Sequence, residues 1–329
     1  MNDKVLEVKG LKTVFTGKKG KVTAVDGVSF SIERGKCLCI VGESGCGKSV
    51  TSLSILRLIP KSTGKIEEGE VLFDGQDLLK MGDEIREIRG NKISMIFQDS
   101  MTGLNPVMTI GKQIEEAIKV HDKKLDKKVL AEKALSILSA VGIPEPEKRM
   151  KEYPHQLSGG MRQRVMIAMA LSAGNNELLI ADEPTTALDV TIQAQILKLM
   201  RELKEKKDTS IILITHDMGV VAEMADYVMV MYAGKEMEYA DVKSLFESPL
   251  HPYTEGLLKS IPKLTTDPNE ELFTIAGSVP SLGNMPKGCR FSTRCTKTCK
   301  KCFEKEPPLF DVDGHKVRCW RYEVSANGR

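Results

Sequence analysis

The sequence predicts an α/β protein in which a parallel core sheet is joined by an antiparallel β portion and a helical insert. Short apolar runs of strand type alternate with segments of helical periodicity, an order typical of parallel sheets with helices on both faces. Four such runs lie at residues 37–41, 93–97, 178–182 and 211–215. The second observation is a glycine-rich loop that follows the first run directly and leads into a helix.

The composition fits a soluble protein that is longer than one typical domain. The chain has 329 residues, of which 41% are hydrophobic and 28% charged, an ordinary globular balance. The first residues hold no apolar segment of secretory type, and no apolar run reaches the roughly 20 residues that a membrane-spanning helix needs. Eight cysteines in a chain without such a leader favour reduced thiols or metal ligands over disulfides.

The first strands lead into a phosphate-binding loop. Residues 4–35 alternate and turn like an antiparallel β entry, and the strand at 37–41 follows. Residues 42–49 then read Gly-Glu-Ser-Gly-Cys-Gly-Lys-Ser, which fits the pattern G-x-x-x-x-G-K-S. Glycines let backbone N–H groups fold around phosphates, and the following helix directs its positive end at them. This loop predicts a nucleoside triphosphate site, with Lys48 at the β- and γ-phosphates and Ser49 on Mg²⁺. The predicted nucleotide contacts are Gly42, Ser44, Gly45, Cys46, Gly47, Lys48, Ser49 and Val50.

A second glycine-opened helix start lies further along the chain. Between residues 98 and 158 apolar residues recur at helical spacing, which predicts an inserted helical portion. It ends at residues 157–163, which read Leu-Ser-Gly-Gly-Met-Arg-Gln. Ser158 suits an N-cap, and a helix from Gly160 to Leu171 would present free N–H groups to a phosphate. One phosphate cannot occupy both this helix start and the phosphate-binding loop of the same chain.

Polar residues follow the three later strands. The strand at 178–182 ends in Asp182, and Glu183 comes next. Asp182 suits Mg²⁺ coordination, mostly through water, whereas Glu183, one residue on, points elsewhere. Gln98 follows the strand at 93–97, and His216 follows the strand at 211–215. Taken singly, a glutamine or histidine at a strand end is more often structural than catalytic.

Together and in this order, these motifs resemble those of ATP-binding cassette (ABC) proteins. The run at 157–163 is similar to the LSGGQ signature of that family, with Met161-Arg162 where the family usually has Gln and a basic residue. The resemblance implies that two cassettes pair head to tail and that each signature closes on ATP held by the other's phosphate-binding loop. It also implies a D-loop at Ala187-Leu188-Asp189. The signature and dimer residues implied in this way are Ser158, Gly159, Gly160, Gln163 and Asp189.

The same resemblance assigns roles around the triphosphate. Glu183 resembles the general base that polarises the attacking water. Gln98 resembles the Q-loop glutamine, which also lies beside Mg²⁺ with Ser49 and Asp182, and His216 resembles the switch histidine that senses the γ-phosphate. Phe15 lies where the family carries an aromatic ring that stacks on adenine, although aromatic residues near a first strand are also common core residues.

The composition changes after about residue 250. His251-Pro-Tyr-Thr opens a proline-rich stretch, and five of the eight cysteines follow residue 288. This loop-rich stretch offers little core to bury thiols, so we expect a metal site in preference to scattered free cysteines. Four thiolates suit either zinc or an iron–sulfur cluster, and the pair Cys299-Lys-Lys-Cys302 favours zinc. The five are Cys289, Cys295, Cys299, Cys302 and Cys319.

The run at 98–106, the His-Pro-Tyr-Thr motif and the cysteine tail together resemble the ATPases of dipeptide and oligopeptide permeases, and nickel permeases share part of this. The resemblance divides the chain into an ATPase domain at 1–250, with a helical subdomain at about 99–165, and a C-terminal extension at 251–329. It also implies a 4Fe–4S cluster, for which Cys299 is spare. The implied cluster ligands are Cys289, Cys295, Cys302 and Cys319.

The function implied by this resemblance is ATP-driven import of di- or oligopeptides, with ATP and Mg²⁺, at the cytoplasmic face of the cell membrane. The implied partners are a second ABC ATPase subunit, identical or not, two membrane-spanning permeases and an extracellular solute-binding protein, without nucleic acid. Nickel import is the main alternative. Soluble cassette ATPases that act on nucleic acid or ribosomes normally carry two cassettes in one chain or a long coiled-coil insert, and the sequence has neither.

Overall fold

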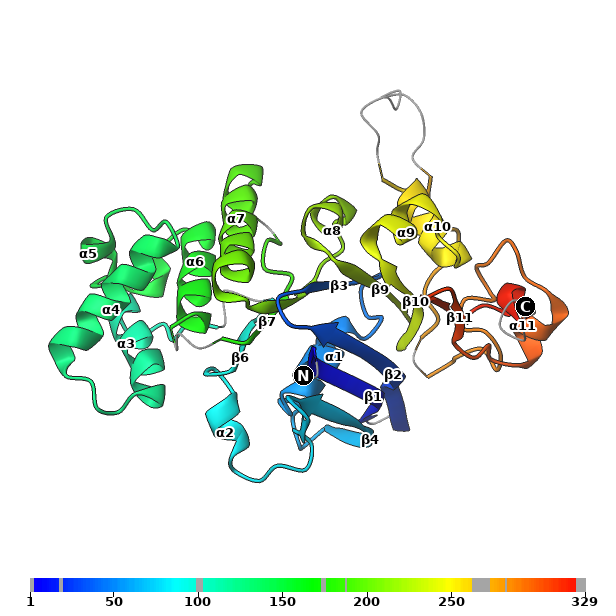
Figure 1. Cartoon of the computed structure of the whole chain (residues 1–329), viewed down its shortest axis with the longest axis horizontal. Coiled ribbons are helices and arrows are strands. Elements are labelled where there is room, and N and C mark those ends of the chain that lie inside the picture. Colours follow the sequence, from blue (N-terminus) through cyan, green and yellow to red (C-terminus); the bar gives the residue numbers. More distant parts are fainter. Residues whose placement is uncertain are drawn as a thin grey trace. The chain divides into compact units, whose positions relative to one another are not determined.

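The computed structural model describes residues 3–17, 20–98, 103–172, 176–186, 188–261, 273–281 and 283–323 (Figure 1). The chain divides into two compact units, and each unit draws on several separate stretches of the sequence. The first unit contains Met1–Val5, Glu33–Lys36 and Lys80–Ile214, and the second contains Leu6–Ile32, Cys37–Leu79 and Thr215–Arg329. In the described part of the chain no helix is long and apolar enough to cross a membrane.

Three parallel strands and a group of helices make up most of the first unit. The strands β6 (Ile93–Ile96), β7 (Leu178–Asp182) and β8 (Ser210–Ile214) pair in parallel in that order. Every residue of β7 and β8 is buried, as is typical of parallel strands covered on both faces. These strands agree with the predicted runs to within one residue at each end. The helices are α2 (Ile85–Ile88), α3 (Ile110–His121), α4 (Lys127–Ala140), α5 (Pro146–Arg149), α6 (Gly159–Ala170) and α7 (Val190–Lys207).

Two sheets make up the core of the second unit. In one sheet the strand order is β2-β1-β4-β5, and β1 pairs antiparallel with β4. This confirms the predicted antiparallel entry, to which the structure adds β4 and β5. In the other sheet β3 pairs in parallel with β9, and β10, β12 and β11 follow as antiparallel strands. The strands are β1 (Lys4–Gly17), β2 (Gly20–Glu33), β3 (Cys37–Val41), β4 (Gly64–Phe73), β5 (Gln76–Asp77), β9 (Tyr227–Tyr232), β10 (Lys235–Asp241), β11 (Phe310–Val312) and β12 (His315–Val317).

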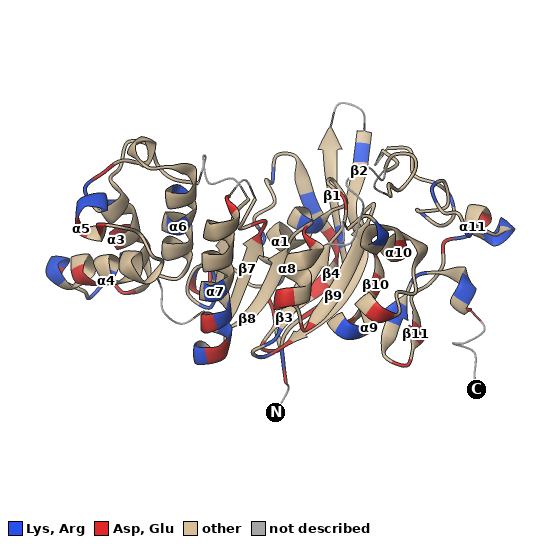
Figure 2. Ribbon diagram, turned by 90° about the horizontal axis from the view of Figure 1, so that it is seen from above, with Lys and Arg blue, Asp and Glu red and all other residues tan. Residues whose placement is uncertain are grey.

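In the described part of the second unit, five α-helices accompany these strands. The helices of the second unit are α1 (Lys48–Ile55), α8 (Met218–Met224), α9 (Val242–Glu247), α10 (Pro252–Lys259) and α11 (Lys300–Glu304). Figure 2 shows β3, β8 and β9 without a charged residue, whereas α4, α5 and α7 carry charges of both signs. The apolar runs that predicted the strands are therefore buried core.

The C-terminal segment adds two strands that the sequence pattern did not reveal. β11 and β12 form a hairpin whose turn, Asp313-Gly314, has φ angles of 54° and 84°. β12 then pairs with β10. Phe310 and Val317 of this hairpin pack with Cys319 in a small buried cluster. Strands of three residues are too short to show a period of two, although an Asp-Gly pair is a known hairpin signal.

Candidate nucleotide site

The phosphate-binding loop of the second unit needs its glycines for steric reasons. It follows β3, in which all five residues are buried. At Gly42 φ is 149°, and an added Cβ would lie 2.1 Å from the backbone oxygen of Met231. At Gly47 φ is 105°, and an added Cβ would lie 2.6 Å from the backbone oxygen of Ala24. The loop is thus fixed against neighbouring backbone, and substitution at either glycine would displace it.

Lys48 lies under this loop at the start of α1. Its side chain is buried, and Nζ donates to the backbone oxygens of Gly42 at 2.7 Å and Glu43 at 3.1 Å. Gly47 is the N-cap of α1, and no side chain caps this helix. A helix start with an adjacent lysine and backbone N–H groups suits a phosphate. Ser49 follows at the first turn and is half-buried.

His216 shares a cavity with the phosphate-binding loop. The cavity has a volume of about 290 Å³, and Gly42, Glu43 and His216 all line it, together with the start of α8 and the end of α10. Asp217 caps α8 by accepting from the N–H groups of Gly219 and Val220. His216 is exposed. The structure therefore brings the predicted switch histidine to the same cavity as the predicted phosphate loop.

In the first unit, the structure brings Gln98 and Glu183 together. Asp182 is the last residue of β7 and is buried. Glu183 has a φ of 47°, a left-handed conformation that is uncommon for a residue other than glycine. Its Oε2 accepts from Gln98 Nε2 at 3.2 Å and from Thr186 Oγ1 at 2.9 Å. Two neutral donors thus orient one carboxylate at the end of a buried strand, and strain of this kind is concentrated at functional sites.

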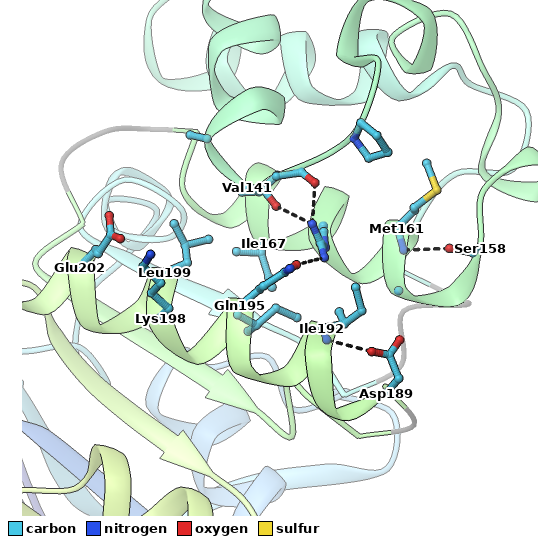
Figure 3. A pocket seen from close by; sticks show the side chains of 16 residues that line it. Val141, Ser158, Met161, Ile167, Asp189, Ile192, Gln195, Lys198, Leu199 and Glu202 are labelled. Atoms are coloured by element: carbon cyan, nitrogen blue, oxygen red, sulfur yellow. Dashed lines mark hydrogen bonds between the residues drawn. The ribbon is translucent and has the colours of Figure 1, made fainter.

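The signature run begins α6, as predicted to within one residue. Ser158 is the N-cap and accepts from the N–H of Met161 at 3.3 Å, and Asp189 caps α7 by accepting from the N–H of Ile192 at 2.9 Å. Both caps line a pocket of about 730 Å³ between α6 and α7, and Figure 3 shows them at the same end of it. Ser158, Gly159 and Asp189 are exposed. An added Cβ at Gly159 would meet nothing within 4 Å, so the helix start is open.

Comparison with known proteins identifies the family. The model of the ABC transporter family matches residues 25–186, and the model of the oligopeptide/dipeptide transporter C-terminal region matches residues 237–302. The chain is 54% identical to the oligopeptide transport ATP-binding protein AppD of Bacillus subtilis, over 97% of each chain. The chain belongs to the ATP-binding subunits of oligopeptide and dipeptide ABC transporters. It is also 53% identical to the dipeptide transport ATP-binding protein DppD of the same organism, over 98% of this chain and 96% of that one.

A solved structure agrees with this family assignment. The dimeric structure of the ATP-binding cassette MJ0796 in a post-hydrolysis state, bound to ADP and Pi, matches with a TM-score of 0.65 at 28% identity. The match covers 72% of this chain and 98% of that one. The chain therefore has the fold of an ABC ATPase, as the sequence predicted.

Two residues of the signature helix of this ABC ATPase face inward. Gln163 is 3% exposed, and its Nε2 donates to the backbone oxygen of Pro184 at 2.8 Å. Its side chain is thus engaged within its own unit, where it connects α6 to the turn after β7. Arg164 is also buried and donates to the backbone oxygen of Gly142 and to Gln195 Oε1. The sequence pattern gave no sign of Arg164, because a charged residue in a helix is usually exposed.

The structure describes the predicted adenine-stacking residue Phe15, but not every residue of the predicted D-loop and of the run at 98–106. Phe15 is half-buried in β1, where it pairs with Gly64 of β4. Its ring packs so closely on Gly64 that an added Cβ there would lie 2.8 Å from ring atom Cε1. Ala187, the first residue of the predicted D-loop, lies outside the described residues, as do residues 99–102 of the run at 98–106.

The tail cysteines differ in exposure, and the cysteine predicted to be spare lies close to one of the predicted ligands. Cys289, Cys302 and Cys319 are buried, Cys295 is half-buried and Cys299 is exposed. The spare cysteine of the prediction, Cys299, has its Sγ 3.4 Å from that of Cys302. These donors suit zinc or an iron–sulfur cluster chemically. Among the residues that the structure describes, however, no three His, Cys, Asp or Glu side chains lie where they could hold a metal ion, so their placement does not fit one.

Proposed function

We propose that this ABC ATPase hydrolyses ATP to drive the import of di- and oligopeptides, with two membrane-spanning permeases and an extracellular solute-binding protein. Support comes from the match to the oligopeptide/dipeptide C-terminal region and from relatives named for oligopeptide and dipeptide transport. ATP hydrolysis would take place at the cytoplasmic face of the cell membrane, and nucleic acid would not be a partner. The proposed division is an ATPase domain at 1–250, with its helical subdomain at about 99–165, and an extension at 251–329.

The observation that carries the proposal is the carboxylate of Glu183, oriented by two neutral donors. In our proposal Glu183 takes the proton of the attacking water, and Gln98 and Thr186 hold its carboxylate in position. Lys48 would bind the β- and γ-phosphates. Ser49, Gln98 and Asp182 carry side-chain oxygen atoms of the kind that Mg²⁺ prefers and would supply its ligands, and the ion when bound would neutralise phosphate charge. His216 would face the γ-phosphate from the cavity it shares with Gly42 and Glu43.

The proposed ATP site is completed by a second ABC ATPase subunit. The open helix start at Ser158, Gly159 and Gly160 would close on ATP held by the partner's phosphate-binding loop, and Asp189 lines the same pocket as Ser158. The relative MJ0796 was solved as a dimer. Gln163 would act in this site only by holding α6 against the turn after β7, because its side chain is buried.

The test of the function replaces Glu183 by Gln, which keeps size and hydrogen bonding but removes the base. ATP should still bind, and hydrolysis should fall on the order of 100- to 10,000-fold. Thr186→Val is the matched control: it keeps the base and removes one of its two orienting donors, so we expect a much smaller loss. Full activity of Glu183→Gln in the assembled transporter would exclude Glu183 as the base.

The substrate class needs a transport assay in cells. A strain that lacks the gene should lose uptake of labelled di- and oligopeptides, and the wild-type gene but not Glu183→Gln should restore it. Loss of labelled nickel uptake with normal peptide uptake would instead identify a nickel importer.

We also propose that the tail binds a metal through cysteine thiolates, as a 4Fe–4S cluster or, alternatively, as zinc. Support comes from the cysteine spacing and from the resemblance of the tail to that of peptide-permease ATPases, and not from the placement of the thiols. Anaerobic purification of single Cys→Ser variants, followed by iron, sulfide and zinc analysis, tests the ligands. Metal retained in Cys299→Ser and lost in Cys289→Ser would support the predicted set, whereas the reverse would assign Cys299.

A further inference from the structure

The C-terminal segment bonds directly to the phosphate-binding loop, at Glu43. The backbone N–H of Glu43 donates to Tyr253 Oη at 2.9 Å, and Tyr253 belongs to the His-Pro-Tyr-Thr motif. The carboxylate of Glu43 accepts from Arg294, whose Nη1 lies 3.0 Å from Oε1 and 2.8 Å from Oε2. Arg294 directly precedes Cys295 in the cysteine tail. Two segments more than 200 positions further along the chain thus hold one residue of the loop.

Both anchors are themselves fixed. Tyr253 is fully buried, and its ring lies 4.8 Å from that of Tyr232 and 5.3 Å from that of Phe291, between centroids. The side chain of Arg294 is 5% exposed. Its Nη2 donates to the backbone oxygen of Ile275 at 3.1 Å, and its Nε donates to that of Ala276 at 3.0 Å. A guanidinium held at all three nitrogens has one orientation, so its bond to Glu43 is preorganised.

The negative charge of Glu43 lies in the loop that is proposed to bind the phosphates. The backbone oxygen of Glu43 accepts from Lys48 Nζ at 3.1 Å. Glu43, which carries a negative side chain, is thus in direct contact with the lysine proposed to bind phosphate. A carboxylate beside a triphosphate repels it, and a carboxylate that turned toward Lys48 would compete with ATP for that cation. Arg294 offsets the negative charge and holds it on the side of the loop where the tail lies.

We propose that Arg294 and Tyr253 are positioning residues for ATP binding, through which the C-terminal segment sets the nucleotide affinity of the phosphate-binding loop. The inference rests on the proposed role of this loop in binding ATP. Arg294 neutralises the Glu43 carboxylate, and Tyr253 accepts from the Glu43 N–H and so fixes the backbone of the loop at this residue. ATP affinity therefore depends on residues of the C-terminal segment.

The test compares ATP affinity in the full-length protein by titration with a fluorescent ATP analogue. Arg294→Ala should weaken binding on the order of tenfold, because it leaves an uncompensated carboxylate beside the phosphates. Glu43→Gln in the same chain should restore affinity to near the wild-type value. Rising salt should shrink the difference between wild type and Arg294→Ala, since screening weakens the repulsion. Lys297→Ala is the matched control, because Lys297 also belongs to the cysteine tail and pairs with a carboxylate that is not part of the loop, that of Glu255.

Each outcome has a distinct meaning. Failure of the wild-type protein to bind ATP would overturn the proposed function itself. Wild-type affinity in Arg294→Ala would overturn the inference while leaving that function intact. Weakened binding that Glu43→Gln does not restore, or an equal loss in Lys297→Ala, would show that Arg294 only supports the fold. For Tyr253, removal of the hydroxyl in Tyr253→Phe should weaken ATP binding without lowering the unfolding temperature as much as Tyr253→Ala, and unchanged affinity would remove Tyr253 from the proposed role.

Discussion

The buried histidine of the His-Pro-Tyr-Thr motif makes stability depend on pH in a calculable way. His251 is 1% exposed, and its Nδ1 accepts from the N–H of Tyr253 at 3.0 Å. Burial lowers the pKa of His251 from 6.5 to about 4. The nearby Glu238 and Glu255 oppose this shift, and Arg318 adds to it. The folded protein therefore holds this imidazole neutral well into the acid range.

The sign and size of the effect follow from linkage. Because the pKa is lower in the folded state, the unfolded state binds more protons between the two pKa values. The stability contributed by His251 is fully present above pH 6.5 and is lost as the pH falls toward about 4. Each pKa unit corresponds to about 1.4 kcal/mol, so roughly 3 kcal/mol is lost over the whole window. Between pH 7.5 and pH 5 the loss is about 2 kcal/mol.

The perturbation that isolates this contribution is His251→Asn. An asparagine side chain can still accept the N–H of Tyr253, but it does not titrate. Urea unfolding at pH 7.5 and pH 5 should show that the variant loses about 2 kcal/mol less stability than the wild type between the two pH values. Because both proteins share every other titrating group, their difference reports His251 alone. An equal loss in the two proteins would refute the argument that burial keeps this histidine neutral.

Three other substitutions test the remaining structural arguments. Ser158→Arg places a bulky cation at the open helix start, so the monomer should still bind nucleotide while ATP-driven dimerisation is lost. Size-exclusion chromatography with ATP measures the dimerisation. An equal loss of nucleotide affinity in the monomer would contradict the head-to-tail pairing. Arg318→Ala leaves Glu236, which is 2% exposed, without its cation at 2.7 Å, and should cost about 3–5 kcal/mol in urea unfolding. Gly42→Ala drives a Cβ against the backbone of Met231 and should weaken ATP binding at least tenfold by titration; tight binding would show that the loop relaxes.

The sequence predicted the fold class, the antiparallel entry and four core strands, because these leave local signals. A fully buried parallel strand such as β7 is a continuous apolar run, and the loop before Lys48 has a fixed pattern of glycines. The ends of the apolar runs placed Gln98 and Glu183 in the sequence and the family resemblance gave them their roles, but only the structure shows the hydrogen bond between them. That bond joins residues 85 positions apart, a separation at which periodicity and spacing carry no information.

What the sequence could not predict depends on long-range packing. Nothing in the local pattern links Arg294 to Glu43, 251 positions away. The inward orientation of Gln163 also depends on what surrounds α6: the helix packs against α3, α4 and β6, so even polar side chains on it are enclosed. For the tail, cysteine spacing states which donors are present and does not state how their sulfur atoms are placed.

The pairing of β12 with β10 limits where segments of such proteins can be swapped or truncated. Glu238 of β10 is fully buried, accepts from the N–H groups of Leu250 and His251, and lies 2.6 Å from His315 Nε2. A chimera joined near residue 250 would set this carboxylate against a foreign hairpin, and a truncation there would leave β10 as a bare sheet edge prone to association. Recombination between related transporter genes should therefore give stable proteins only when β10 and the β11–β12 hairpin come from the same parent.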